Sequence, residues 1–171
     1  TNSTYDPNHV IKKAGEKLVA MDIQGGQTLY QSALLSWVDD AQFGGDSGNI
    51  DQLREAIATL WISYAHYLQK AKQYKSTSEI YEDATKCPVS GQIGRIWLEY
   101  ARFLEERGKV RNAQQIYLRA LVGDKKNTNS SIEHPEGGVH DEQDRALLWS
   151  EFLRMMQTKQ PDLTLPALKE A

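Results

Sequence analysis

The sequence lacks several features that mark particular classes of protein. Cys87 is its only cysteine, which excludes an intrachain disulfide and a cysteine-based zinc cluster and fits a reducing compartment. No stretch approaches the roughly 18 consecutive apolar residues that span a bilayer, and no basic and apolar leader opens the chain. From these absences we expect a soluble, intracellular protein with no membrane partner.

Basic residues are not in excess either. The chain has 20 Lys and Arg against 23 Asp and Glu, a net charge of −3, and no run of Lys or Arg stands out. A site that follows a phosphate backbone needs several cations on one face. We therefore expect no direct nucleic-acid partner.

Motifs of catalysis and cofactor binding are also missing. The chain has no nucleophile elbow and no His-Glu-x-x-His motif. The glycine cluster at 44–49 follows a helical pattern and lacks the Lys-Ser/Thr ending of a phosphate loop. His134 and His140 have acidic neighbours, but their spacing matches no compact zinc pattern. The sequence therefore predicts no enzyme, no metal site and no cofactor.

The sequence does contain an internal repeat. Shifting it by 36 residues aligns 61–68 with 97–104 without a gap, and the aromatic positions coincide. The match continues downstream, where 77–84 falls on 113–120. A period of this length is typical of solenoids built from helical hairpins.

Each repeat is expected to fold as two helices. In the first half, the aromatic and small residues at offsets 0, 3, 4, 6 and 7 from Trp61 or Trp97 share one helical face. In the second half, offsets 0, 3, 4 and 7 from Thr77 or Ala113 do the same. Ile62 and Leu98 lie beside the main stripe, where a neighbouring hairpin can bury them. A closed helical bundle is the alternative. Between the halves, Gly108 in one copy and Lys72 in the other predict different turns, with the tighter turn in the second copy.

The second copy carries the residues of a known motif. They are Trp97, Tyr100, Phe103, Leu104, Glu105, Gly108, Ala113, Ile116, Tyr117, Arg119, Ala120 and Leu121. This set resembles the half-a-tetratricopeptide (HAT) motif of RNA-processing scaffolds such as crooked neck and suppressor of forked. In the first copy Gln69 replaces the acid of the motif and Asp83 its arginine, while Cys87 and Pro88 match its end. The resemblance implies an all-α fold of antiparallel helical hairpins, stacked as a HAT/TPR-like right-handed solenoid.

The domain organisation follows from the repeats. We expect a single helical-repeat domain over 1–171, a fragment of a longer protein because it lacks an initial methionine and ends within an expected helix. Asp6 and Pro7 predict the start of the first helix, and Gly25 and Gly26 predict its end. The expected parts are a divergent hairpin (6–43), a repeat (50–88), a repeat (93–122), a flexible insertion (124–144) and the start of a further repeat (145–171).

The resemblance also implies a function. It predicts a non-enzymatic, protein-binding scaffold in a nuclear RNA-processing complex, acting in pre-mRNA splicing, 3′-end processing or rRNA maturation. The implied partners are other proteins of a multi-subunit complex, or a second copy in a homodimer formed through the repeat array. The alternative is a TPR-like, peptide-binding adaptor of a chaperone or mitotic checkpoint system. A carboxylate clamp of that kind needs clustered cations and Asn on the first helices, which instead hold Ser63, His66, Glu99 and Glu106.

Two sets of residues follow from the repeat register. The exposed face of the first helices is expected to bind partner proteins. The alternative is a solvated face stabilised by ion pairs such as Glu99 with Arg102, which would give the same sequence pattern. That face consists of Ser63, His66, Lys70, Glu99, Arg102 and Glu106. The predicted repeat core, in which the three tryptophans anchor successive contacts, consists of Trp61, Tyr64, Tyr67, Ile80, Tyr81, Trp97, Tyr100, Phe103, Ile116, Tyr117, Trp149 and Phe152.

Overall fold

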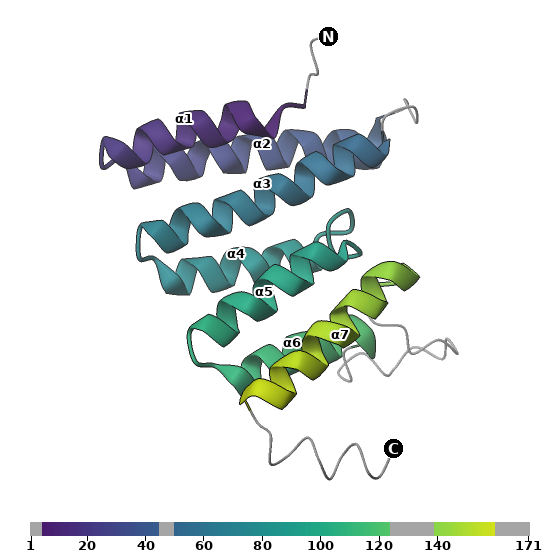
Figure 1. Cartoon of the computed structure of the whole chain (residues 1–171). Helices are drawn as coiled ribbons and strands as arrows, with labels where there is room; N and C mark the ends of the chain where they lie inside the picture. The colour runs from purple at the N-terminus through teal and green to yellow at the C-terminus, as the bar shows by residue number, and fades with distance from the viewer. Residues whose placement is uncertain (1–4, 45–49, 124–138, 160–171) are drawn as a thin grey trace. The chain divides into compact units, whose positions relative to one another are not determined.

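A computed structural model describes residues 5–44, 50–123 and 139–159, and these residues form helices joined by turns, with no β-strand among them (Figure 1). The all-α class is confirmed. Most of the predicted insertion at 124–144, and residues 160–171 of the last predicted repeat, lie outside the described residues. The helices are α1 (Pro7–Val19), α2 (Ile23–Phe43), α3 (Ile50–Lys70), α4 (Tyr74–Lys86), α5 (Gly94–Glu106), α6 (Val110–Leu121) and α7 (Glu142–Lys159).

The chain divides into two compact units, Thr1–Gly91 and Gln92–Ala171. The first unit contains two antiparallel hairpins, α1 with α2 and α3 with α4, and both α1 and α2 pack on α3 (Figure 1). Within this unit, one hairpin therefore stacks on the next, as a helical repeat requires. The shared core consists of Ala14, Tyr30, Leu34, Trp37, Leu53, Ala56, Ile57, Leu60, Tyr64, Tyr67 and Leu68.

The first hairpin corrects one sequence prediction. Gly25 and Gly26 do not end the first helix, because α1 ends at Val19 and both glycines lie in the first turn of α2. Asp22 is the N-cap of α2, and its carboxylate accepts a hydrogen bond from the Gly25 backbone N–H at 2.9 Å. This cap stabilises a helix start that the low helical propensity of two glycines argues against.

The turns inside the hairpins correct a second prediction. Met21, Lys72 and Gly108 occupy equivalent places and have φ values of 62°, 60° and 76°. In each turn the following residue donates its N–H to a carbonyl five residues earlier, at 2.8 Å, 2.9 Å and 2.8 Å respectively. The turns of the two clear repeats are therefore alike, contrary to the expectation from Lys72. The helix ending requires a left-handed residue, and packing of the hairpin imposes it on lysine as well as on glycine.

Lys72→Gly is expected to raise the free energy of unfolding by about 0.5–1 kcal/mol. A left-handed residue other than glycine costs roughly 1–2 kcal/mol, and the greater freedom of glycine in the unfolded chain offsets part of the gain. Urea denaturation measures the change. Gly108→Ala is the matched control, because it introduces the same strain and should lower stability by about 1 kcal/mol. A lower denaturation midpoint for Lys72→Gly would contradict the shared turn.

The second unit contains the α5–α6 hairpin and α7, which packs on both of its helices. The start of α7 is tied to the end of α6, since Arg145 donates hydrogen bonds to the carbonyls of Val139 and Leu121, each at 2.9 Å. At the other contact, Gly94 of α5 lies directly against Asp144, which accepts a hydrogen bond from its N–H at 3.1 Å. Helix α7 is thus fixed to the hairpin by backbone groups as well as by packing.

The predicted repeat core is unevenly buried. Trp61 and Ile80 are half-buried, while the other residues predicted for the core, apart from Trp149, are buried. Trp149 differs from the prediction, because 41% of its surface is exposed. The buried stripe of α7 is instead formed by Leu148, Phe152 and Met155. Their spacing of four and three residues selects a helical face about 100° away from Trp149, so the helix is rotated relative to the predicted register.

Candidate protein-interaction surfaces

The face predicted to bind partners is divided between the two units. Ser63, His66 and Lys70 lie on α3 of the first unit, where Ser63 is half-buried and the other two are exposed. Glu99, Arg102 and Glu106 lie on α5 of the second unit. Their role in binding remains a prediction, but the structure shows what those on α5 contact.

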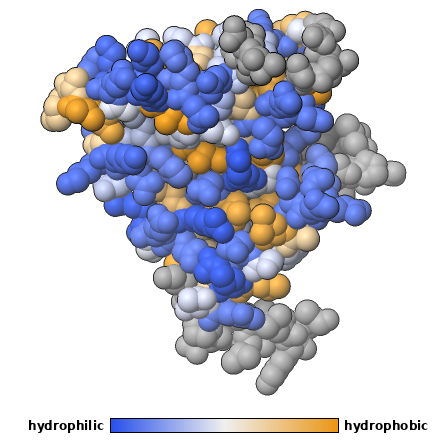
Figure 2. Space-filling model, turned by 45° about the horizontal axis from the view of Figure 1, so that its top comes forward, coloured by the Kyte–Doolittle hydropathy of each residue, from blue (hydrophilic) through white to orange (hydrophobic). Residues whose placement is uncertain are grey.

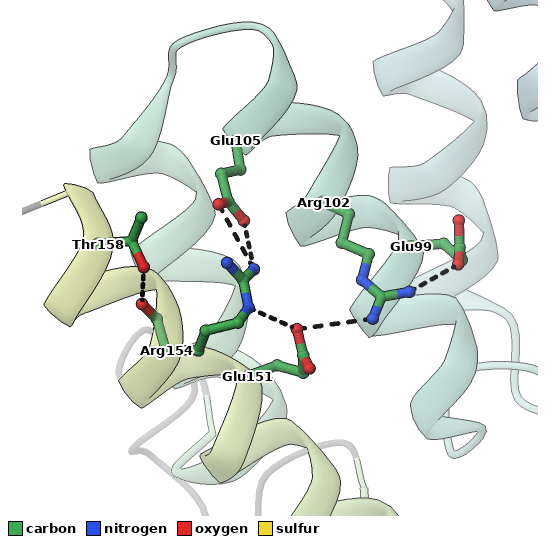
Figure 3. A network of polar contacts seen from close by, with 6 residues as sticks. All are labelled: Glu99, Arg102, Glu105, Glu151, Arg154 and Thr158. Atoms are coloured by element: carbon green, nitrogen blue, oxygen red, sulfur yellow. Dashed lines mark hydrogen bonds and ion pairs between the residues drawn. The ribbon is translucent and has the colours of Figure 1, made fainter.

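A network of charges joins α5 to α7 (Figure 3). Arg102 of α5 lies 3.5 Å from Glu99 on its own helix and 3.5 Å from Glu151 on α7. Arg154 of α7 lies 3.0 Å from Glu151 and 3.1 Å from Glu105 on α5. The side chains of Glu105 and Glu151 are only 11% and 19% exposed, so water screens these ion pairs less than it screens fully exposed pairs. The network stabilises the packing of α7 on α5.

The network also determines which charges are available to a partner. Glu99 and Arg102, both predicted to bind partners, are engaged within the unit, whereas Glu106 is exposed. Beneath the network, the Tyr117 ring lies 5.4 Å from the ring of Phe152. Burial raises the pKa of the Tyr117 hydroxyl to about 12, and the charges of Glu105 and Glu151 add to the shift. This part of the second unit is therefore a helix contact rather than an open binding face.

Hydrophilic side chains predominate on the face drawn in Figure 2, and hydrophobic atoms appear there as separate patches. Exposed apolar residues in the first unit include Leu35 on α2, with 77% of its surface exposed. Single exposed apolar residues are common on protein surfaces. Leu35 differs from them because it lines a groove.

This groove, called here the α2–α4 groove, has a volume of about 370 Å³. Helix α2 supplies one wall, α4 the other, and Trp61 and Tyr64 of α3 line it between them. The volume lies near the lower end of the roughly 300–1,000 Å³ range of ligand pockets, which suits a few side chains. The lining residues are Gln31, Leu34, Leu35, Val38, Asp39, Gln42, Trp61, Tyr64, Ile80, Asp83 and Cys87.

Tyr64 is held rigidly at the groove. Its hydroxyl donates a hydrogen bond to Gln27 at 3.2 Å and accepts one from Gln31 at 3.1 Å. Its ring stacks on that of Tyr30, with centroids 5.1 Å apart. Burial raises the pKa of Tyr64, the hydrogen bond from Gln31 opposes this shift, and the charge of Asp83 adds to it. The groove lining is thus preformed at this point, which lowers the entropic cost of binding.

The groove has aliphatic walls, and its charged lining residues are acidic. Leu34, Leu35, Val38 and Ile80 are aliphatic, whereas Asp39 and Asp83 supply two exposed carboxylates, and no Lys or Arg is among the lining residues. The groove therefore favours an apolar and cationic ligand over an anionic one.

Comparison with known proteins identifies the repeat family that these helices resemble. Residues 54–136 match a family model described as the PRP39 C-terminal HAT repeat. Residues 54–136 carry HAT repeats. The match spans both clear copies of the repeat and confirms the resemblance inferred from the sequence. No curated protein and no solved structure gave a match to the chain.

The HAT repeat is a helical scaffold of a non-catalytic type, and HAT proteins generally mediate contacts between proteins. None of the helices in the described part of the chain combines the length and apolarity needed to cross a membrane. Among the same residues, no three His, Cys, Asp or Glu side chains gather as a metal site would require, and His134 lies outside them.

The two HAT copies differ at one motif position beside the groove. In the second copy, the guanidinium of Arg119 lies 5.4 Å from the ring centroid of Trp97. The equivalent residues of the first copy, 36 positions earlier, are Asp83 and Trp61, and both line the α2–α4 groove. The sequence shows that Asp83 replaces the motif arginine, but the groove was not predicted from it. The available signal was this replacement of a cation by a carboxylate in a copy that keeps the motif tryptophan, Trp61.

Proposed function

We propose that this chain is a protein-binding scaffold of a nuclear RNA-processing complex, and that the process is pre-mRNA splicing. The observation that carries the proposal is the match of residues 54–136 to a HAT repeat described for PRP39. The HAT resemblance of the sequence points to the same class of complex. The partners are other proteins of the complex, and a second copy of the chain is a further candidate.

The charge distribution supports protein rather than RNA as the direct partner. The net charge is −3, and Arg102 and Arg154 are each paired with glutamates. A cation that already neutralises a carboxylate has less favourable energy to gain from a phosphate, because the existing pair must first be broken. The aromatic residues that could stack on bases, including Tyr30, Tyr81 and Trp97, are buried.

We expect the isolated chain to show no appreciable affinity for RNA. The measurement is a titration with single-stranded and duplex RNA at about 0.15 M salt, repeated at higher salt. Micromolar or tighter binding that weakens with salt, and that is lost when Arg102 and Lys70 are replaced, would contradict the expectation.

The scaffold function is tested by affinity purification of the full-length protein from nuclear extract, followed by mass spectrometry. RNase treatment before elution removes partners that are held only through RNA. Retention of RNA-processing proteins after RNase supports the proposal. Recovery of chaperones or checkpoint proteins in their place would overturn it and favour the peptide-binding adaptor.

A further inference from the structure

Two equivalent tryptophans of the HAT copies have different surroundings. Trp97 is 4% exposed, and the guanidinium of Arg119 lies 5.4 Å from its ring centroid. Trp61 is half-buried and lines the α2–α4 groove, where Asp83 stands in place of the arginine. The second copy thus supplies its own cation to the tryptophan, whereas the first copy has a carboxylate at that position.

The position in the first copy is open and negatively charged. Neither Asp39 nor Asp83 forms an ion pair within the part of the chain that the structure describes, although both line the groove. The buried indole N–H of Trp61 also has no acceptor among those residues. A cation bound over the ring would meet two carboxylates and the negatively polarised face of an indole, a combination that attracts it electrostatically.

We propose that the α2–α4 groove binds a segment of a partner protein through an arginine side chain, which takes beside Trp61 the place that Arg119 takes beside Trp97. This inference rests on the proposed protein-binding function and specifies the chemistry of one partner. The guanidinium pairs with Asp83 and Asp39, and apolar residues next to the arginine cover Leu35, Val38 and Ile80.

Arginine fits this site better than lysine does. Its planar guanidinium stacks on aromatic rings and donates several hydrogen bonds in a fixed fork, so that it can contact a ring and two carboxylates together. It is also more weakly hydrated than an ammonium group and is more easily moved into a groove with aliphatic walls. A nucleic acid or an anionic lipid is disfavoured by the same two carboxylates.

The exposure of Leu35 supports a short peptide segment as the occupant. With 77% of its surface exposed, Leu35 stands at the groove without being needed for the core of the first unit. Burial of such an apolar side chain by a ligand is favourable, and the volume of about 370 Å³ accommodates a few side chains rather than a folded surface.

The test begins with selection of a random 12-residue peptide library, displayed on phage, against the whole 171-residue chain. We expect the enriched peptides to share an arginine beside large apolar residues. A synthetic copy of the most enriched peptide is then titrated by fluorescence anisotropy, next to a copy with citrulline in place of arginine. Citrulline keeps the shape and loses the charge, and we expect it to bind at least tenfold more weakly. Absence of enrichment, or equal binding of the two peptides, would overturn the proposal.

The decisive variant is Asp83→Arg, which gives the first copy the cation of the second. The new arginine at position 83 is expected to cover Trp61 itself, in the place of the peptide arginine, and so to weaken binding of the peptide at least tenfold. Glu79→Arg is the matched control, because Glu79 is an exposed acidic residue of the same helix that does not line the groove. It makes the same change in net charge and should alter binding by less than twofold. Equal binding by the wild type and Asp83→Arg contradicts the assigned site.

A second pair of variants tests the apolar wall. Leu35→Glu should also weaken binding at least tenfold, whereas Val19→Glu, at a residue with 87% exposure outside the groove, should leave it unchanged. Thermal unfolding of each variant shows whether lost binding reflects lost folding, and the exposed positions of Leu35 and Asp83 predict unchanged midpoints. A Leu35→Glu variant that is folded and still binds the peptide overturns the groove as the site.

This proposal and the scaffold function can fail separately. If the purification retains RNA-processing proteins but no arginine peptide is enriched, the groove assignment falls and the scaffold function stands. If the purification yields no RNA-processing protein, the scaffold function is overturned, irrespective of the result of the peptide selection. If peptides bind and Asp83→Arg removes one specific partner from the purification, both proposals are supported.

Discussion

Replacement of Trp97 by alanine is expected to lower the free energy of unfolding by about 3–5 kcal/mol, the range for loss of a buried tryptophan. The ring is 4% exposed on α5, and Arg119 lies above it at 5.4 Å. Truncation therefore removes apolar contacts, leaves a cavity and takes away a cation–π contact that contributes about 0.5–1 kcal/mol in other proteins.

The other repeat tryptophans provide a graded control. Trp61 is half-buried and has no equivalent of Arg119, so Trp61→Ala should cost less than Trp97→Ala. Trp149 is 41% exposed, and Trp149→Ala should change stability by about 1 kcal/mol or less. Urea denaturation followed by far-UV circular dichroism measures all three without relying on tryptophan fluorescence. Equal losses at the three positions would contradict the burial order, and an unchanged midpoint for Trp97→Ala would contradict the repeat register itself.

The helical hairpins could be predicted from the sequence because their signals are local. Trp97, Tyr100 and Phe103 recur at helical spacing and have counterparts 36 residues earlier, so both the helix and its buried face follow from the pattern. The structure places all three in the buried part of α5. Such a stripe survives in the fold because the neighbouring hairpin helix covers the face that the spacing defines.

The charge network depended on tertiary contacts that the sequence pattern does not contain. The pair of Glu99 and Arg102 is three residues apart on one helix and was foreseeable, whereas Glu105 and Arg154 are 49 residues apart and meet only because α7 packs on α5. The predicted binding face on α5 was therefore partly occupied by a helix of the same unit. Periodicity indicates which side of a helix is polar, but it does not indicate what lies against that side.

The rotation of α7 and the position of the α2–α4 groove were unpredictable for a related reason. On α7, Leu148 and Trp149 are adjacent apolar residues, and either could start the buried stripe. Packing against α5 and α6 selects Leu148. The groove depends on the distance between α2 and α4, two helices that are separated in sequence by α3, and no local pattern specifies that distance.

Replacement of Gly26 by alanine is expected to lower the free energy of unfolding by about 1–3 kcal/mol, the usual range for overpacking a core. Gly26 lies in the first turn of α2, and a Cβ atom there would meet the hydroxyl and ring of Tyr67 on α3. Tyr67 cannot easily move away. It is 4% exposed, its ring lies 5.7 Å from that of Tyr30, and its hydroxyl donates a hydrogen bond to the Ile23 carbonyl at 2.9 Å.

A matched substitution in the same unit should have the opposite sign. Gly15 lies in the interior of α1, and a Cβ atom at this position would meet nothing within 4 Å beyond the backbone of its own helix. Gly15→Ala should therefore raise stability by about 0.5–1 kcal/mol, since alanine restricts the unfolded chain and favours the helix. Lower stability for Gly15→Ala would show that helix propensity does not govern α1 as assumed.

A double-mutant cycle with Tyr67→Phe identifies the cause of the loss at Gly26. In the wild type, removal of the Tyr67 hydroxyl breaks its hydrogen bond to Ile23 and should cost about 0.5–1.5 kcal/mol. In the Gly26→Ala background, that hydroxyl is one of the Tyr67 atoms pressed against the new methyl, together with ring carbons that phenylalanine keeps, so its removal relieves part of the clash and should cost less. The two substitutions should therefore deviate from additivity by at least about 0.5 kcal/mol, as contacting residues do. Strict additivity would mean that the Tyr67 hydroxyl does not limit this position.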